Sequence, residues 1–198
     1  MSSEPAIKLR PSSVVLRVVG APDAEPPLGD GEIPLEKLYE RYAPYVAAIA
    51  MRILGREGEV DDLVQDVFAM AVRGLRRRRE HLEIRSWLAT VTVRRSMYQL
   101  RRRALWGLLD LAEEPNYDKV ADQGVDAEQR QLVSEIYRAL DQLPSRQRVP
   151  WVLRHIEGES LQRVADLCGC SLATAKRRIE AAHVSISRAV EGKGRHGS

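Results

Sequence analysis

The sequence has few of the residues that build covalent frameworks or metal sites. Only two of its 198 residues are cysteine, Cys168 and Cys170, and they stand two positions apart. This spacing implies no disulfide framework, so a reducing cytoplasm is the expected setting. Packing within a turn is favoured for this pair over metal binding or oxidation sensing.

Catalytic signatures are missing as well. There is no glycine-rich phosphate loop, and no nucleophile stands beside a base. The four histidines are scattered without a metal-ligand spacing: His81, His155, His183 and His196. We therefore expect a protein that is not an enzyme and needs no cofactor or metal.

Long apolar runs are also missing. The tightest run near the start, Val14 to Val19, is interrupted by Arg17. It is too short to span a membrane and lacks the uninterrupted core of a signal peptide. We expect a soluble cytoplasmic protein without membrane insertion.

What the chain does have is strongly segregated charge. The net charge of +3 conceals eleven Arg against two Glu from Arg73 to Arg103, and seven acids against one Lys from Leu108 to Glu128. Asp30 to Met70 holds nine acids against four bases. Adjacent basic and acidic segments indicate a chain that binds a polyanion through its basic surface and a protein through its acidic surface.

Length and periodicity indicate two small helical units. Residues 1–31 are rich in proline, and disorder is favoured there over a docked strand at Val14 to Val19. An apolar 3.6-residue pattern from Leu38 to Ile53 then predicts a helix that stops at Gly55. Pro44 is expected to bend or split that helix.

A second helix is predicted from Gly58 to about Gly74, with three polar residues opposite its apolar face: Asp62, Gln65 and Asp66. Leu75 to Arg85 reads as a basic loop. A third helix is predicted over Ser86 to Arg103, although the β-branched run Thr90 to Val93 would suit a strand. Helix is favoured because packing overrides propensity and no partner strand is evident.

The acidic stretch 104–127 has weak periodicity and is interpreted as a linker with a short helix at Leu105 to Leu111. Beyond it, Leu132 to Leu140 and Val149 to Ile156 predict two further helices. Pro150 is tolerable there only in the first turn of its helix.

Near the C-terminus the pattern predicts a helix-turn-helix. Cys168-Gly169-Cys170 forms the turn, and Ser171 caps the second helix. The predicted buried stripe of the first helix is Leu161, Val164, Ala165 and Cys168, and that of the second is Leu172, Ala175, Ile179, Ala182 and Ile186. The residues expected to face solvent are Thr174, Lys176, Arg177, Glu180 and Ala181. A helix of this kind can lie in the major groove of DNA.

Four segments, in this order, resemble successive parts of the extracytoplasmic-function (ECF) sigma factors of bacterial RNA polymerase. They are LYERYAPYVAAIAMRILG, DDLVQDVFAMAVRGL, RSWLATVTVRRSMYQLRRR and ALDQLPSRQRVPWVLRHIEGESLQRVADLCGCSLATAKRRIEAAH. The resemblance implies an all-α fold of two small domains, with sigma region 2 as a helical bundle in residues 32–103. It places sigma region 4, a four-helix domain with the helix-turn-helix, in residues 128–191. A flexible acidic linker, 104–127, joins them, and residues 1–31 and 192–198 are expected to be disordered.

The resemblance also implies a function in transcription initiation. Such factors bind core RNA polymerase, recognise the minus-10 and minus-35 promoter elements and help melt the DNA. Asp62, Gln65 and Asp66 match positions that contact the clamp helices of the β′ subunit, and the β subunit is a further expected contact. The implied minus-10 residues are Arg76, Arg77, Arg78, Arg79, Arg94, Arg95, Tyr98, Arg101 and Arg102. The implied minus-35 residues are Ser171, Thr174, Lys176, Arg177, Arg178 and Glu180.

Some positions depart from the family pattern. Family members commonly have Phe at Arg78, Asn at Arg94 and Asp at Tyr98, which leaves the base preference at the minus-10 element open. Val149-Pro150 replaces the usual acidic residue after Arg-Gln-Arg, and we expect a shifted helix start there. Trp87 matches the family's Trp and is interpreted as core packing rather than a stacking platform.

A second interpretation is a regulator that binds duplex DNA through the helix-turn-helix without sigma activity. The two interpretations can be distinguished by substituting Asp62, Gln65 and Asp66, because only a sigma factor loses function when its polymerase contact is removed. Family members are often held inactive by an anti-sigma factor, so such a partner is expected, although no residue identifies one. The promoter sequence, regulon, inducing signal and role of the N-terminal extension stay open.

Overall fold

The computed structural model describes residues 35–75, 84–107, 117 and 126–194, and within these ranges it contains seven α-helices and no strand. The fold class is therefore all-α, as predicted. The predictions for residues 1–31, most of the basic loop and the end of the short linker helix lie outside the described residues. The helices are α1 (Leu35–Leu54), α2 (Gly58–Leu75), α3 (Ile84–Gly107), α4 (Ala127–Asp141), α5 (Ser145–His155), α6 (Leu161–Cys168) and α7 (Leu172–Gly194).

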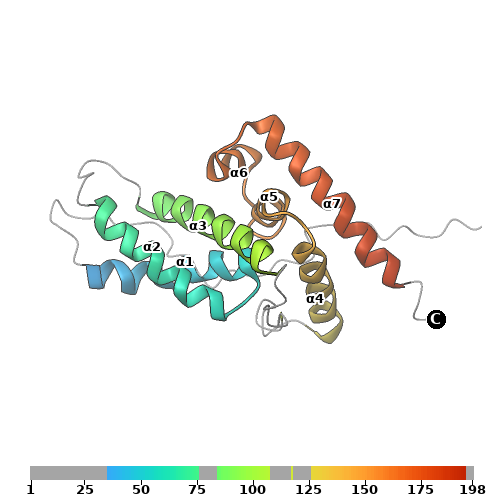
Figure 1. The fold of residues 1–198 in the computed structure, drawn as a ribbon, viewed down its shortest axis with the longest axis horizontal. Coiled ribbons are helices and arrows are strands. Elements are labelled where there is room, and N and C mark those ends of the chain that lie inside the picture. The colour runs from blue at the N-terminus through green and yellow to red at the C-terminus, as the bar shows by residue number, and fades with distance from the viewer. Residues whose placement is uncertain (1–34, 76–83, 108–116, 118–125, 195–198) are drawn as a thin grey trace, which may run out of the picture.

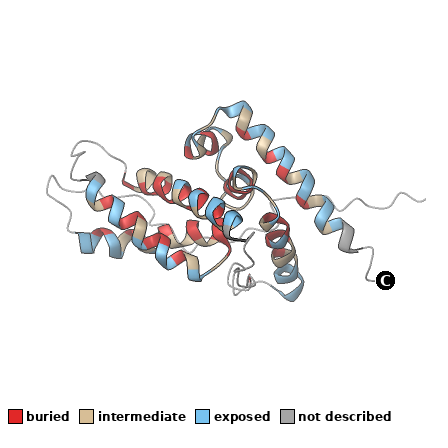
Figure 2. Ribbon diagram, in the orientation of Figure 1, coloured by how far each residue is buried: buried red, intermediate tan, exposed pale blue. Residues whose placement is uncertain are grey.

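The helices form two units (Figure 1). In the first unit α1, α2 and α3 all pack against one another. In the second, α5 and α7 make the largest contact, with α4 packed on α7 and α6 on both α5 and α7. Buried residues form stripes on the inward side of the helices (Figure 2), which is the pattern that the 3.6-residue periodicity predicts.

Helix α1 runs unbroken through Pro44, so the predicted split does not occur. Pro44 is exposed, and so is Glu40, whose carbonyl loses its helical partner to the proline ring and can bond to water instead. The helix ends as predicted, because Gly55 adopts φ 69° and its N–H donates to the Met51 carbonyl at 2.7 Å.

Helix α3 confirms the helical interpretation of the β-branched run. The hydroxyls of Thr90 and Thr92 donate to the carbonyls of Ser86 and Leu88, four residues earlier, at 2.9 and 2.7 Å. These back-bonds satisfy both hydroxyls inside the helix. Trp87 is half-buried and packs against the core, as predicted. The helix continues to Gly107, past the expected end at Arg103.

Helix α5 corrects the expectation for Pro150. The helix begins at Ser145, so Pro150 is buried in its second turn rather than its first. The carbonyl that this proline leaves without a helical partner is that of Arg146, an exposed residue that water can reach. Because water can reach this carbonyl, the helix tolerates Pro150 in its second turn, although a proline was expected only in the first turn.

The helix-turn-helix forms with the predicted turn at Gly169 and the predicted cap at Ser171, and with a further cap at Ser160 that was not predicted. The Ser160 hydroxyl accepts from the Arg163 N–H at 3.1 Å, and Gly169 closes α6 at φ 61°. The Ser171 hydroxyl accepts from the Thr174 N–H at 3.2 Å, which confirms it as the cap of α7.

Two predictions for the buried stripes are wrong. Leu172 is 39% exposed, because the first turn of α7 projects beyond the helices beneath it. In α6, Leu167 is fully buried whereas Cys168 is only half-buried. At the end of this helix the buried face therefore includes the residue before Cys168 rather than Cys168 itself.

The two units also touch each other. Helix α3 packs against α5 and α6, and α1 packs against α5. In Figure 1, α5 lies at the centre of the molecule, between α3 and α7. Tyr117, in the stretch interpreted as a linker, is only 4% exposed and stacks at an angle against Tyr137 of α4, with ring centroids 5.6 Å apart.

Candidate functional site

The first candidate surface is the polar side of α2. Asp62 and Gln65 are exposed and Asp66 is half-buried, so the three predicted residues share one accessible face. The Asp66 carboxylate forms an ion pair with the Arg95 guanidinium of α3. The two halves of this pair come from different predicted sets, one for polymerase and one for DNA, so the structure brings these sets together.

A shallow apolar groove adjoins this face. It lies between α1 and α2 and has a volume of about 500 Å³. Tyr39 and Phe68 line it with their rings 4.9 Å apart, and Gln65 and Val72 also contribute. Glu36 and Glu40 lie at the same groove. An apolar groove flanked by carboxylates suits a partner helix that carries both apolar and basic residues.

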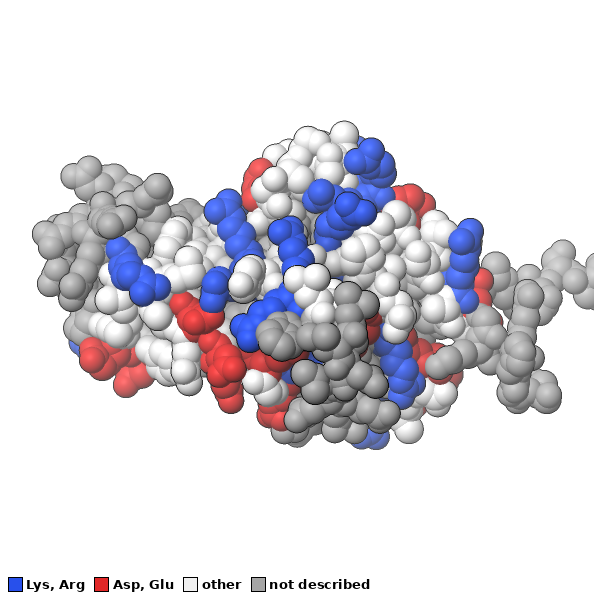
Figure 3. All heavy atoms as spheres, viewed as in Figure 1, with Lys and Arg blue, Asp and Glu red and all other residues white. Residues whose placement is uncertain are grey.

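The second candidate surface is a basic stripe along α3. Arg94, Tyr98 and Arg101 are spaced four and three residues apart, so they lie on one side of the helix, and all three are exposed. The Arg95 guanidinium lies 5.5 Å from the centre of the Tyr98 ring. Figure 3 shows Lys and Arg side chains across the middle of the molecule, with acidic side chains below them.

The stripe suits a nucleic acid backbone, and its tyrosine offers a face on which a base can stack. Arg102 is exposed beside Arg101 and completes the described part of the predicted minus-10 set. Arg76, Arg77, Arg78 and Arg79 lie outside the described residues.

The third candidate surface is the start of α7. Ser171, Lys176, Arg177 and Glu180 are exposed, while Thr174 and Arg178 are half-buried. The structure therefore brings all six residues of the predicted minus-35 set to one helix, four of them open to solvent. Because Ala175, Ile179 and Ala182 are buried on the opposite side, the orientation of this surface is set by the core.

The packing behind α7 includes two histidines with no predicted role. His155 of α5 lies with its ring centroid 5.5 Å from that of His183 of α7 and 4.9 Å from that of Trp151. Burial, together with the neighbouring His183 and Arg154, lowers the pKa of His155 to about 4. Both histidines therefore pack within the α5–α7 contact.

The cysteine pair behaves as packing residues. Burial raises the pKa of the Cys168 thiol to about 12, and Cys170 adds to this shift while Arg178 opposes it. A thiol that stays protonated is a poor metal ligand and a poor nucleophile. Within the described ranges no group of three or more His, Cys, Asp or Glu could hold a metal ion.

Sequence reasoning missed a polar cluster between the two units. Its centre is Arg148 of α5, which is 1% exposed, and Asp141 at the end of α4. Arg148 precedes Val152 by four residues and so stands on the apolar face of its helix. A charge on an apolar face is the signal that could have identified a buried pair.

None of the described helices combines the length and apolar composition that crossing a membrane requires.

Comparison with known proteins identifies both units. Residues 38–105 match the family described as sigma-70 region 2, and residues 134–182 match sigma-70 region 4. The chain is 28% identical over 148 residues to the ECF RNA polymerase sigma factor SigE of Mycolicibacterium smegmatis, covering 73% of this chain and 56% of that protein. It is 28% identical over 146 residues to EcfG of Rhodopseudomonas palustris, covering 73% and 78%. The ECF sigma-E factor of Escherichia coli is 27% identical over 163 residues, covering 78% and 85%.

Solved structures support the same fold. The sigma factor RpoE of Bartonella quintana, in complex with the anti-sigma factor NepR, superposes with a TM-score of 0.56 at 22% identity and covers 79% of this chain and 96% of its own. CnrH, in complex with the cytosolic domain of CnrY, gives 0.52 at 21% identity and covers 80% and 88%. With both sigma regions present in the expected order, the chain belongs to the sigma-70 family and, within it, to the extracytoplasmic-function sigma factors.

Proposed function

We propose that this protein is a promoter-specificity subunit that binds core RNA polymerase and directs transcription to promoters with defined minus-10 and minus-35 elements. The observation that carries this proposal is the presence of sigma regions 2 and 4 in one chain. Residues 32–103 act as region 2 and residues 128–191 as region 4, with residues 104–127 between them. The protein has no catalysis of its own and acts in the cytoplasm by binding.

The polar side of α2 is the proposed polymerase contact. Asp62, Gln65 and Asp66 bind the clamp helices of the β′ subunit, and the adjoining groove receives apolar side chains of the same partner. Exposed carboxylates steer a basic partner and speed its association, while apolar burial supplies affinity. The β subunit forms a further contact with the chain.

The other two surfaces are the proposed DNA contacts. Arg94, Arg95, Tyr98, Arg101 and Arg102 of α3 bind the minus-10 element, together with the preceding residues Arg76, Arg77, Arg78 and Arg79. Opening this element costs a few kcal/mol per extruded base, which a cationic track and stacking offset. On α7, three residues contact bases of the minus-35 element: Lys176, Arg177 and Glu180. Arg178 lies closer to the phosphate backbone. Ser171 and Thr174 lie at the start of the helix.

An anti-sigma factor is the proposed inhibitory partner. RpoE of Bartonella quintana was solved in complex with the anti-sigma factor NepR, and CnrH in complex with the cytosolic domain of CnrY. This supports the same kind of partner for this chain.

A run-off transcription assay with purified protein and core polymerase tests the proposal. We expect specific transcripts that core polymerase alone does not make. The double variant D62N/D66N should lose most of this activity, because it removes both carboxylates of the polymerase contact. Transcript quantity and a binding assay with core polymerase measure the effect.

The matched control is E128Q/E135Q on α4, which changes the net charge equally but lies in the other unit. It should keep full activity. If the full chain gives no transcripts beyond those of core polymerase, the sigma function is excluded. If D62N/D66N keeps its function in cells, a regulator that binds operators without polymerase contact takes its place.

A further inference from the structure

Helices α1 and α2 leave an apolar surface open to solvent where α1 begins. The groove between them is lined by Tyr39 and Phe68, whose ring centroids lie 4.9 Å apart, and by Leu35 at the first position of α1. Leu35 and Tyr39 are 42% and 45% exposed, whereas Leu38 and Tyr42 on the inner side of the same helix are buried. Exposed apolar side chains that gather in one place indicate a surface for interaction.

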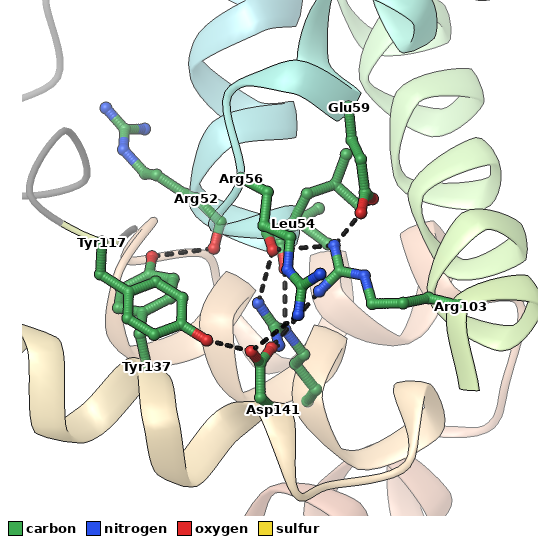
Figure 4. Close-up of polar contacts among 10 residues, drawn as sticks. Arg52, Leu54, Arg56, Glu59, Arg103, Tyr117, Tyr137 and Asp141 are labelled. Carbon is green, nitrogen blue, oxygen red and sulfur yellow. Dashed lines mark hydrogen bonds and ion pairs between the residues drawn. The ribbon is translucent and has the colours of Figure 1, made fainter. Parts of the chain in front are cut away.

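Two carboxylates at this groove can take a cation. Around the contact between the two units, Asp141 and Glu59 already have partners, since each forms an ion pair with an arginine (Figure 4). Glu36 and Glu40 are exposed, and neither forms an ion pair with another residue of the described ranges. Because they are four residues apart on α1, they lie on the same side of the helix. The groove is therefore apolar, with negative charge along its α1 side.

The sequence that precedes α1 contains one segment with complementary properties. Residues 6–19 hold three bases and no acid: Lys8, Arg10 and Arg17. They also include the apolar run Val14 to Val19. An apolar segment with positive charge is complementary to an apolar groove with carboxylates on one side.

Residues 20–34, which join this segment to α1, have the opposite character. They hold four acids and no base, together with four prolines and three glycines. Their negative charge disfavours binding beside Glu36 and Glu40, and their composition is typical of a linker. Residues 6–19 are therefore the better occupant of the groove, and residues 20–34 are its tether.

The tether ends at the groove itself. It is bonded to Leu35, which lines the groove. A flexible tether of fifteen residues has a root-mean-square span of about 20 Å and gives the attached segment an effective concentration of about 1 mM at the site. An affinity of about 0.1 mM, too weak to hold a separate peptide at low concentration, then fills about nine-tenths of the grooves.

The apolar run also matches the groove in length. Along α2 the groove extends from Gln65 to Val72, which is about 10 Å at about 1.5 Å per residue. In an extended segment Val14, Leu16 and Val18 fall on one side and span about 13 Å. Three alternate apolar side chains can therefore enter the groove together.

The groove adjoins the proposed polymerase contact. Gln65 lines it, and Asp62 and Asp66 stand three residues before and one residue after Gln65 on α2. A segment in the groove covers Gln65 and brings positive charge close to the two carboxylates. It therefore opposes the approach of the basic partner that these carboxylates attract.

We propose that residues 6–19 bind in the groove between α1 and α2 of the same chain and compete with core RNA polymerase for it. Val14, Leu16 and Val18 enter the apolar part, and the bases of the segment face Glu36 and Glu40. The competition rests on the proposed sigma function, whereas the docking does not. Because only the undocked fraction is competent, docking raises the apparent Kd for core polymerase in inverse proportion to that fraction.

A single fluorine label tests the docking without polymerase. Phe68 is the only phenylalanine of the sequence and lines the groove, so full-length protein made with fluorinated phenylalanine gives one fluorine NMR signal, from this site. The variant V14S/L16S/V18S removes apolar side chains from the segment and leaves every residue of the seven described helices unchanged. We expect its signal to move relative to wild type, because the ring loses its contact with the segment.

The matched control is A21S/A24S/L28S, which makes three changes to serine in the tether. Its signal should stay at the wild-type position. A synthetic peptide of residues 6–19, added at millimolar concentration to V14S/L16S/V18S, should return the signal to that position. Equal positions in wild type and V14S/L16S/V18S overturn the docking. A wild-type signal that moves with protein concentration also overturns it, because the occupant is then a second copy of the chain.

Binding to core polymerase tests the competition. With about nine-tenths of the grooves filled in wild type, V14S/L16S/V18S should lower the apparent Kd about tenfold, and A21S/A24S/L28S should leave it unchanged. Equal Kd values in wild type and V14S/L16S/V18S overturn the competition even if the fluorine signal moves. If the signal follows the docking and no variant binds core polymerase, the sigma function fails while the docking stands.

Discussion

Arg148 is a charged side chain at a position that a helical pattern assigns to the core. It is tolerated at 1% exposure because its guanidinium meets two carbonyls and one carboxylate. Burial alone raises the pKa of Asp141, but Arg148 and the Tyr117 hydroxyl outweigh burial and hold that pKa below its usual value. The carboxylate is therefore ionised at neutral pH, and the pair is complete.

Replacing Arg148 by Met should reduce the free energy of unfolding by about 3 kcal/mol, because the Ile53 carbonyl loses its side-chain donor and the Leu54 carbonyl and the Asp141 carboxylate each lose one of theirs. Urea unfolding measures the change. The control is R146M on the same helix, where the arginine is exposed and the expected effect is below about 0.5 kcal/mol. Equal effects in the two variants contradict the burial and pairing of Arg148.

At the scale of elements, α3, α5 and α7 show where local rules hold and where packing overrides them. The caps of α6 and α7 follow the local rule, since Ser160 and Ser171 each bond an N–H three residues on. The β-branched run of α3 is helical despite its preference for strands, because Val91 and Val93 are buried against neighbouring helices in this conformation. Whether a proline is tolerated depends on solvent access to the carbonyl it frees, which no local pattern reports.

The α5–α7 contact predicts a pH dependence of stability. The pKa of His155 is about 4 in the folded chain and 6.5 when unperturbed. Between these values the unfolded chain binds more protons, so the free energy of unfolding should fall as pH falls from 6.5 to 4. Thermal unfolding across this range measures it.

The control for this prediction is H155F, which keeps an aromatic ring against Trp151 but cannot take up a proton. Its stability should fall less steeply in the same window. The comparison between the two chains isolates His155 from Glu157, whose pKa is raised by burial in opposition to Arg52 and whose contribution has the opposite sign. Parallel pH profiles show that His155 is not buried in this contact.

At the scale of the whole molecule, charge is divided among separate surfaces, which we propose to contact different partners. The acidic side of α2 and the basic stripe of α3 are separate, but Asp66 and Arg95 pair where they meet. The numbers of acidic and basic residues in each segment predicted this division, because they can be counted directly in the sequence. The closed contact of the two units was not predicted, because its residues lie up to 105 positions apart.

The DNA surfaces should differ in how they respond to salt and sequence. With holoenzyme, R101A/R102A should weaken binding evenly across promoter sequences and lower the slope of log affinity against log salt by about 1 to 2. R177A should instead relax the preference at one position of the minus-35 element, by about 1 to 3 kcal/mol. Filter-binding titrations at several salt concentrations separate the two, and a loss of preference in R101A/R102A would reverse the assignment.

The helices, the Ser171 cap and the helix-turn-helix follow from residues close together in the sequence, so periodicity and turn chemistry were enough to predict them. Leu172 at the surface, Pro150 inside a helix and Tyr117 in the core depend on which distant segments come together. The same holds for the Arg148–Asp141 pair. Such contacts are settled by packing and by the need to give every buried polar group a partner, and both exist only once the chain has folded.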